Sequence, residues 1–334
     1  MAEEMAGHAE GAMDEDGHMP GSGTDAASRA ERRAWRDRLN DRAARTLLLG
    51  TVSTLAGGAF WGLSGTCASF LFDAYHLDTA WLMSVRQLLA GALFMAIALA
   101  FDRKRLVRLW TTPAHRRQLA VFAVFGLLSN QFFYLMAVRL TNAGTATVMQ
   151  CLELLIVMAV SCMRAHRRPR RREVAGVALA LAGTFLLATG GDPTKLAIPP
   201  AGLAMGLLTA VGAAGVTLTP ATILPEYGSN IVTGSAMFSS GIVTSLLVRP
   251  WESVPAMEAD GWFALAVMVV VGSFLAYLLF LQGVKDVGSM RASLLGTVEP
   301  ISATITSALF LGTIFAPTDI AGFGLIIAMV FLTV

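Results

Sequence analysis

Charged residues are scarce in this 334-residue chain: they make up 14% of it, whereas an ordinary soluble domain carries about 25%. A soluble protein of this length needs polar faces on its surface helices, so the scarcity excludes a water-facing surface of normal size. From Leu47 onward the chain consists of apolar blocks separated by short loops. The sequence therefore predicts an all-α membrane protein.

Cysteine and catalytic motifs are also scarce. The three cysteines, Cys67, Cys151 and Cys162, lie in apolar blocks without paired spacing, so the sequence indicates neither a disulfide framework nor a CxxC metal site. HExxH, Walker A, GxSxG and deaminase-type zinc patterns are absent. His8 and His18 lie among acidic residues, where a solvated tail is favoured over weak metal binding. We therefore expect no cofactor, no metal and no enzymatic activity.

The N-terminal segment changes character before the first apolar block. Residues 1–28 are acidic and polar, and we expect them to be disordered. Residues 29–46 form a basic juxtamembrane segment, which we expect to be helical and to lie along the cytoplasmic headgroups. Its arginines are Arg29, Arg32, Arg33, Arg36, Arg38, Arg42 and Arg45. The acidic start does not fit a cleaved secretory signal.

Ten blocks approach the roughly 20 apolar residues that a helix needs to cross about 30 Å of hydrocarbon. Their limits are 47–70, 80–101, 117–138, 141–163, 172–190, 200–221, 229–248, 260–283, 286–312 and 318–334. The loops after the second and fourth blocks are rich in Lys and Arg, whereas the loops after the first and fifth contain only Lys195. Basic loops accumulate on the cytoplasmic side. We therefore expect a multi-pass protein of a bacterial inner membrane with both termini in the cytoplasm.

The two halves of the chain show a weak internal repeat. A shift of 146 residues pairs Val138 with Val284, Glu153 with Glu299, Ser161 with Ser307, Gly176 with Gly322, and Phe185 with Phe331. Five spans in each half place the two copies in opposite orientations, which is an inverted repeat. We therefore expect five-helix repeats at 47–190 and 200–334.

Three segments resemble the drug/metabolite transporter superfamily, EamA type. They are Phe60 to Gly62, the run from Ala137 to Gln150, and the run from Ala292 to Pro300. The resemblance covers residues 47–334 and implies ten helices in two inverted five-helix repeats and, in general, export of small metabolites. Leu154 stands where the family usually has proline, so the sequence does not predict a matching kink in both halves. Arg167 and Thr313 stand where the family often has glutamate.

Two carboxylates within apolar blocks are the first candidate site residues. A charge at the bilayer centre costs roughly 2.5–3.5 kcal/mol on insertion scales, so Glu153 and its repeat partner Glu299 are expected to face the interior of the helix bundle. Gln150 lies one turn before Glu153 on the same face. These residues would bind solute or couple protons; the alternative is a hydrogen-bonded carboxyl that joins two helices.

Further candidates surround this pair. Pro300 lacks an N–H and should free a backbone carbonyl near Gly296, with a kink that is either functional or only structural. The other candidates are polar or aromatic: Asn130, Gln131, Tyr134, Tyr277 and Trp61. They would line a cavity; the alternative is that they form hydrogen bonds or packing contacts between helices. For Arg86, we favour a structural role in which it snorkels to the interface or pairs with an acid.

These observations predict a secondary transporter that moves a small organic metabolite, such as an amino acid or related solute, outward by alternating access. A membrane-embedded enzyme or lipid-handling scaffold is the alternative, and a receptor is a third. The expected partners are a small-molecule solute and the lipid bilayer, without nucleic acid. The sequence leaves a homodimer open.

Overall fold

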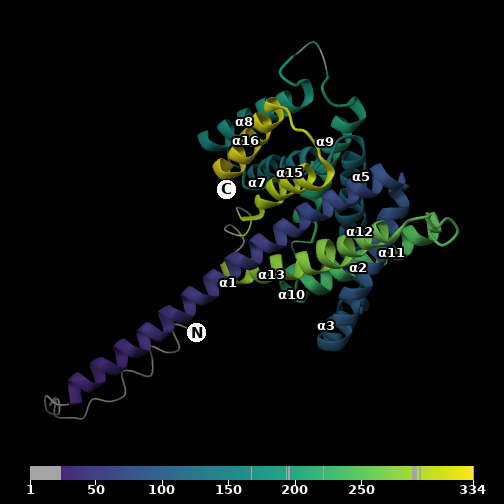
Figure 1. The fold of residues 1–334 in the computed structure, drawn as a ribbon. Helices are drawn as coiled ribbons and strands as arrows, with labels where there is room; N and C mark the ends of the chain where they lie inside the picture. Colours follow the sequence, from purple (N-terminus) through teal and green to yellow (C-terminus); the bar gives the residue numbers. More distant parts are fainter. Residues whose placement is uncertain are drawn as a thin grey trace. The chain divides into compact units, whose positions relative to one another are not determined.

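The computed structural model describes residues 24–166, 168–192, 194, 196–220, 222–287, 292 and 295–333. All regular secondary structure in these ranges is helical (Figure 1). His8, His18, Arg167 and Lys195, which the sequence singled out, lie outside them.

The chain divides into two compact units, Met1–Leu48 and Leu49–Val334. Helix α1 (Thr24–Tyr75) begins in the first unit. Residues 24–28, the end of the segment expected to be disordered, are therefore helical, as is the basic segment 29–46 that follows. Residues 1–23 lie outside the described ranges.

Eight helical stretches within the described residues are long and apolar enough to cross a membrane. They comprise Ala44–Tyr75 of α1; α2 (Thr79–Phe101); α4 (Pro113–Val121), η1 (Phe122–Leu128) and α5 (Ser129–Leu140) together; α6 (Ala143–Gln150) with α7 (Glu153–Arg164); α8 (Arg171–Thr189); α9 (Pro200–Leu218); and α11 (Ser229–Val248). The eighth stretch, Ala259–Val284, contains α12 (Ala259–Val269), η2 (Val270–Leu275) and most of α13 (Ala276–Val287).

Two further apolar helices are shorter: α15 (Val298–Leu311) and α16 (Pro317–Thr333). The 14 residues of α15 extend about 21 Å at 1.5 Å per residue, less than the roughly 30 Å of a hydrocarbon core. A turn at Thr297 interrupts the expected block 286–312 before α15 begins. Residues 288–291, 293 and 294 of this block lie outside the described ranges.

Polar caps and residues with restricted backbones set the helix ends. Asp78 Oδ1 accepts from Trp81 N at 2.9 Å before α2, and Asn142 Oδ1 accepts from Thr145 N at 2.8 Å before α6. Gly190 and Gly312 end α8 and α15 in the left-handed conformation, with φ of 62° and 64°, which glycine adopts without strain. These signals explain why most helix ends lie within a few residues of their predicted positions.

Two spans contain π-helical segments that the apolar pattern did not predict. η1 interrupts the span of α4 and α5, and η2 interrupts the span of α12 and α13. The shift that aligns Glu153 with Glu299 also places η2 on positions 124–129 of the first half, which overlap η1. A π-helix adds a residue to the turn and redirects the side chains that follow, often at functional sites.

Short helices occupy two connections that the sequence predicted as loops. The basic connection after α2 contains α3 (Arg103–Thr111), which buries Leu106 and Leu109. The connection after α9 contains α10 (Leu224–Tyr227), and Arg108 Nη2 lies 2.9 Å from Glu226 Oε1 between the two.

Glycines allow several helices of the Leu49–Val334 unit to pack closely. α2 lies beside α11, and α8 lies beside α16 (Figure 1). A Cβ on Gly91 would collide with the backbone nitrogen of Phe238, and one on Gly241 would lie 2.5 Å from Leu88 N. Small residues give close backbone contact between membrane helices, so α2 and α11 form a tight pair.

Candidate functional site

A polar cavity of about 520 Å³ lies among the helices of the Leu49–Val334 unit. Its walls come from α1, α2, η1, α5, α6, α7, α9, α10, α11, α13, α15 with the segment that leads into it, and α16. All ten residues proposed from the sequence line it: Trp61, Asn130, Gln131, Tyr134, Gln150, Glu153, Tyr277, Gly296, Glu299 and Pro300. The structure brings these residues together; their part in binding a solute stays a prediction.

Two helix breaks present the carboxylates to the cavity. In the first half, a turn at Cys151 and Leu152 separates α6 from Glu153, the first residue of α7. In the second half, a turn at Thr297 precedes α15, whose second residue is Glu299. Cys151 and Thr297 are separated along the chain by the same interval as Glu153 and Glu299. Both halves are therefore broken at equivalent positions, one turn or less before the glutamate.

The break before Glu153 forms without the proline that the family usually carries. Cys151 N donates to Val148 O, and Leu152 N donates to Met149 O, both at 3.1 Å. These bonds span three residues instead of four, so the chain tightens into a 3₁₀ turn. The sequence, with Leu154 after Glu153, did not predict a matching interruption in the two halves, and the structure contains one.

Glu299 is positioned by close contact between α15 and the Leu49–Tyr75 part of α1. A Cβ on Gly62 would lie 2.5 Å from Glu299 O and 2.6 Å from Ala303 N. Ser302 Oγ also donates to Ala59 O at 2.9 Å. The backbone at the start of α15 therefore lies directly against α1, next to Trp61.

Arg86 lies in the cavity wall and not at the interface, which corrects the snorkelling interpretation. Its side chain is buried, with 6% of the residue exposed. Arg86 Nε donates to Ser273 Oγ at 2.7 Å, and Ser273 Oγ donates to Met268 O at 3.0 Å. Because η2 turns Ser273 toward Arg86, a buried cation is fixed in the same cavity as two carboxyl groups.

Aromatic rings form one wall of the cavity. The Trp61 and Tyr277 ring centroids are 5.0 Å apart at an interplanar angle of 75°, and those of Trp61 and Phe280 are 4.8 Å apart. Tyr134 Oη lies 3.2 Å from Thr147 Oγ1. The wall combines flat apolar faces with polar tips, so it can contact both the apolar and the polar part of a solute.

Two polar atoms of the lining have no hydrogen-bond partner among the described residues: Ser64 Oγ and Asn130 Oδ1. Buried polar groups are normally paired, because an unpaired one costs about 1–3 kcal/mol. Both residues line the cavity, but these two atoms are themselves buried.

Several lining residues were not predicted from the sequence, including Ser64, Thr147, Thr233 and Phe280. Ser64 follows Trp61 by three residues and shares its helix face, a spacing that could have identified it. Within the described residues, no three His, Cys, Asp or Glu side chains gather in a possible metal site.

A model of the EamA-like transporter family matches residues 48–189 and 200–334 of this chain. The chain is 30% identical over 283 residues to the uncharacterized inner membrane transporter YicL of Salmonella typhimurium, with 85% of this chain and 94% of that protein covered. It is 24% identical over 276 residues to the uncharacterized transporter YwfM of Bacillus subtilis, with 82% and 90% covered.

A solved crystal structure is similar with a TM-score of 0.58 at 17% identity, over 86% of this chain and 96% of that one. At that sequence identity the similarity shows a common fold, and it does not show a common function. The family and relatives confirm the resemblance that the motifs suggested.

Proposed function

Since this chain belongs to the EamA-like transporter family, we propose that it is a secondary transporter that moves a small organic solute across the inner membrane through the polar cavity. Its relatives are named as membrane transporters, which favours a transporter over an enzyme. We propose the transport step, its direction and the class of solute.

The observation that carries the proposal is the composition of the cavity. Glu153, Glu299 and Arg86 line one space of about 520 Å³ together with Trp61 and Tyr277. Ionisable side chains inside a membrane are costly, and they mark substrate or ion pathways more often than structural sites. The volume is within the range of about 300–1,000 Å³ that is usual for small-molecule sites.

We propose ten transmembrane helices arranged as two inverted five-helix repeats, 47–190 and 200–334. The two stretches that match the family model, 48–189 and 200–334, support these boundaries. The contacts of α2 with α11, of α6 with α15 and of α8 with α16 also support the arrangement, because each helix then packs against its repeat counterpart. In this arrangement α15 and α16 are the ninth and tenth spans.

Alternating access between the two repeats is the mechanism that we propose. The breaks at Cys151 and Thr297 divide the two helices that carry Glu153 and Glu299. Discontinuous helices near the membrane midplane expose backbone groups to a solute, and movement of one repeat against the other opens the site to each side in turn. Small organic solutes with both apolar and polar groups, such as amino acids, fit the mixed lining of the cavity.

Export is the proposed direction, with both termini in the cytoplasm. The basic residues of α3 and of the Arg164–Arg172 segment support this orientation. Metabolite profiling of cells with and without the protein tests the function: one solute should accumulate inside deletion cells and in the medium of overproducing cells. Unchanged solute levels in both strains would contradict export.

A further inference from the structure

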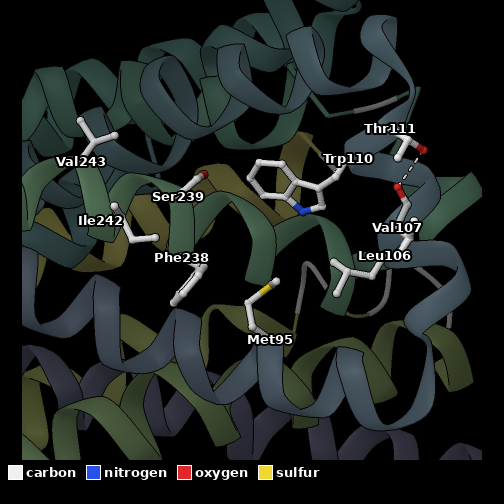
Figure 2. Close-up of a pocket in the computed structure, with 9 residues that line it drawn as sticks. All are labelled: Met95, Leu106, Val107, Trp110, Thr111, Phe238, Ser239, Ile242 and Val243. Carbon is white, nitrogen blue, oxygen red and sulfur yellow. Dashed lines mark hydrogen bonds between the residues drawn. The ribbon is translucent and has the colours of Figure 1, made fainter.

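A second recess of about 570 Å³ lies apart from the polar cavity, between α2, α3 and α11. Figure 2 shows the nine side chains that line it: Met95, Leu106, Val107, Trp110, Thr111, Phe238, Ser239, Ile242 and Val243. None of them lines the polar cavity. We call this recess the lateral crevice.

The lining of the lateral crevice offers almost no polar group to a ligand. Thr111 Oγ1 donates to Val107 O at 2.9 Å, a bond drawn in Figure 2, and Ser239 Oγ donates to Ala236 O at 3.1 Å. Trp110 Nε1 donates to Ser235 Oγ at 3.3 Å. Because these polar groups are already bonded within the protein, the crevice suits an apolar chain better than a polar solute.

The crevice extends from the end of the spans toward the membrane interior. α3 follows directly after the span α2, whereas Ser239 and Val243 lie in the middle and the later part of α11, which begins at Ser229. At roughly 1.5 Å per residue these two positions are about 15 and 21 Å along the helix axis from Ser229. Val107 and Val243 are 50% and 53% exposed, so the crevice is open to the surroundings of the protein.

A basic cluster lies at the α3 end of the crevice. Arg103 precedes Leu106 and Val107 by three and four residues, and Lys104 precedes Val107 by three, so both share the crevice face of α3. Arg103, Lys104 and Arg105 are exposed, and they outnumber the acidic Asp102 before them. Basic groups beside apolar recesses at the ends of membrane helices attract anionic lipid headgroups.

We propose that the lateral crevice binds an anionic phospholipid, with one acyl chain between α3 and α11 and the phosphate at Arg103 and Lys104. The apolar lining fits the acyl chain, and the basic cluster at one end fits the phosphate. The crevice runs from that cluster toward the membrane interior, which is the direction of a lipid's acyl chain. Arg105 is a neighbouring cation on a different face of α3, so it provides a matched control.

Quenching of Trp110 by brominated lipids tests the proposal. The full-length protein is placed in phosphatidylcholine vesicles that contain brominated phosphatidylglycerol or brominated phosphatidylcholine. The Trp110 signal is the difference between the wild type and Trp110→Phe. We expect phosphatidylglycerol to quench Trp110 roughly 5–30-fold more effectively per lipid, since each cation near an anionic surface adds about fivefold.

Arg103→Gln combined with Lys104→Gln should abolish this preference, and Arg105→Gln should retain it. Equal quenching of wild-type Trp110 by both lipids would overturn the proposal. So would an equal loss of the lipid preference in the double variant and in Arg105→Gln. Quenching by iodide in place of lipid would show a water-filled crevice, and protection from all quenchers would show a second protein copy there; either result contradicts a bound lipid. Native mass spectrometry of the wild type and the double variant measures the same preference for phosphatidylglycerol as bound lipid, without the need for Trp110→Phe.

Discussion

Arg86 and Ser273 are joined by a 2.7 Å hydrogen bond from Arg86 Nε to Ser273 Oγ. Ser273 lies in the π-helical segment η2 and in turn donates to Met268 O, five residues earlier. The extra residue of the π turn thus has a local consequence: it directs a hydroxyl group to a buried guanidinium. Among the described residues that line the polar cavity, Arg86 is the only cation, and this bond fixes its direction.

Ser273→Ala should weaken transport through misplacement of Arg86. A hydrogen bond to a charged group contributes about 1.5–3 kcal/mol, so we expect a rise of roughly 10–100-fold in the concentration of solute that gives half-maximal transport. Solute uptake by proteoliposomes measures this change. The control is Ser245→Ala, since Ser245 is also buried and its Oγ has no partner among the described residues. Equal effects of the two substitutions would contradict a specific role for the bond.

Gly62→Ala should disturb the contact between α1 and α15 behind Glu299. The added Cβ would meet the backbone of α15 at 2.5 Å, and overpacking of this kind costs about 1–3 kcal/mol. Thermal unfolding of the purified protein should show a lower midpoint and a loss of transport. Gly324→Ala in α16 is the matched control, because no atom of the described residues lies within 4 Å of its added Cβ. An unchanged midpoint for Gly62→Ala would contradict this prediction, because it would show that α1 and α15 move apart at little cost.

Cysteine labelling tests the proposed orientation. In a variant without Cys67, Cys151 and Cys162, we expect Thr194→Cys to react with a membrane-impermeant maleimide on intact cells or spheroplasts. Arg105→Cys in α3 should react only after the membrane is permeabilised, because basic loops face the cytoplasm. The reverse pattern would place the termini outside and would remove the basis for the proposed orientation.

The sequence could predict the family and much of the cavity lining, because the relevant signals are local. A glutamate in an apolar block cannot face lipid at low cost, and this fact alone directs Glu153 and Glu299 to the interior of the bundle. Gln150 and Tyr134 follow from helical spacing once one face is chosen. The recurrence of glutamate at the equivalent position of the second half joined these local signals into one predicted site.

Other features depend on contacts between distant segments and have no local signal. Arg86 is held in the cavity by Ser273, 187 residues away, and the π turn that presents Ser273 has no recognisable pattern in an apolar run. The break before Glu153 arises from 3₁₀ bonds at Cys151 and Leu152 and not from a proline. The lateral crevice likewise requires that α11 lie beside α2 and α3, which a one-dimensional pattern does not reveal.

The central claim is that Glu153 and Glu299 carry solute transport, and flux through proteoliposomes tests it most directly. The purified protein is reconstituted and uptake of a broad panel of amino acids and other metabolites is followed, with Glu153→Gln and Glu299→Gln compared with the exposed Glu258→Gln. Loss of a charge-assisted bond of about 1.5–3 kcal/mol should lower flux at least roughly tenfold in the two cavity variants. Their thermal unfolding should stay close to that of the wild type, and Glu258→Gln should transport normally. Absence of flux for every solute in the panel, or normal flux in both cavity variants, would contradict the account.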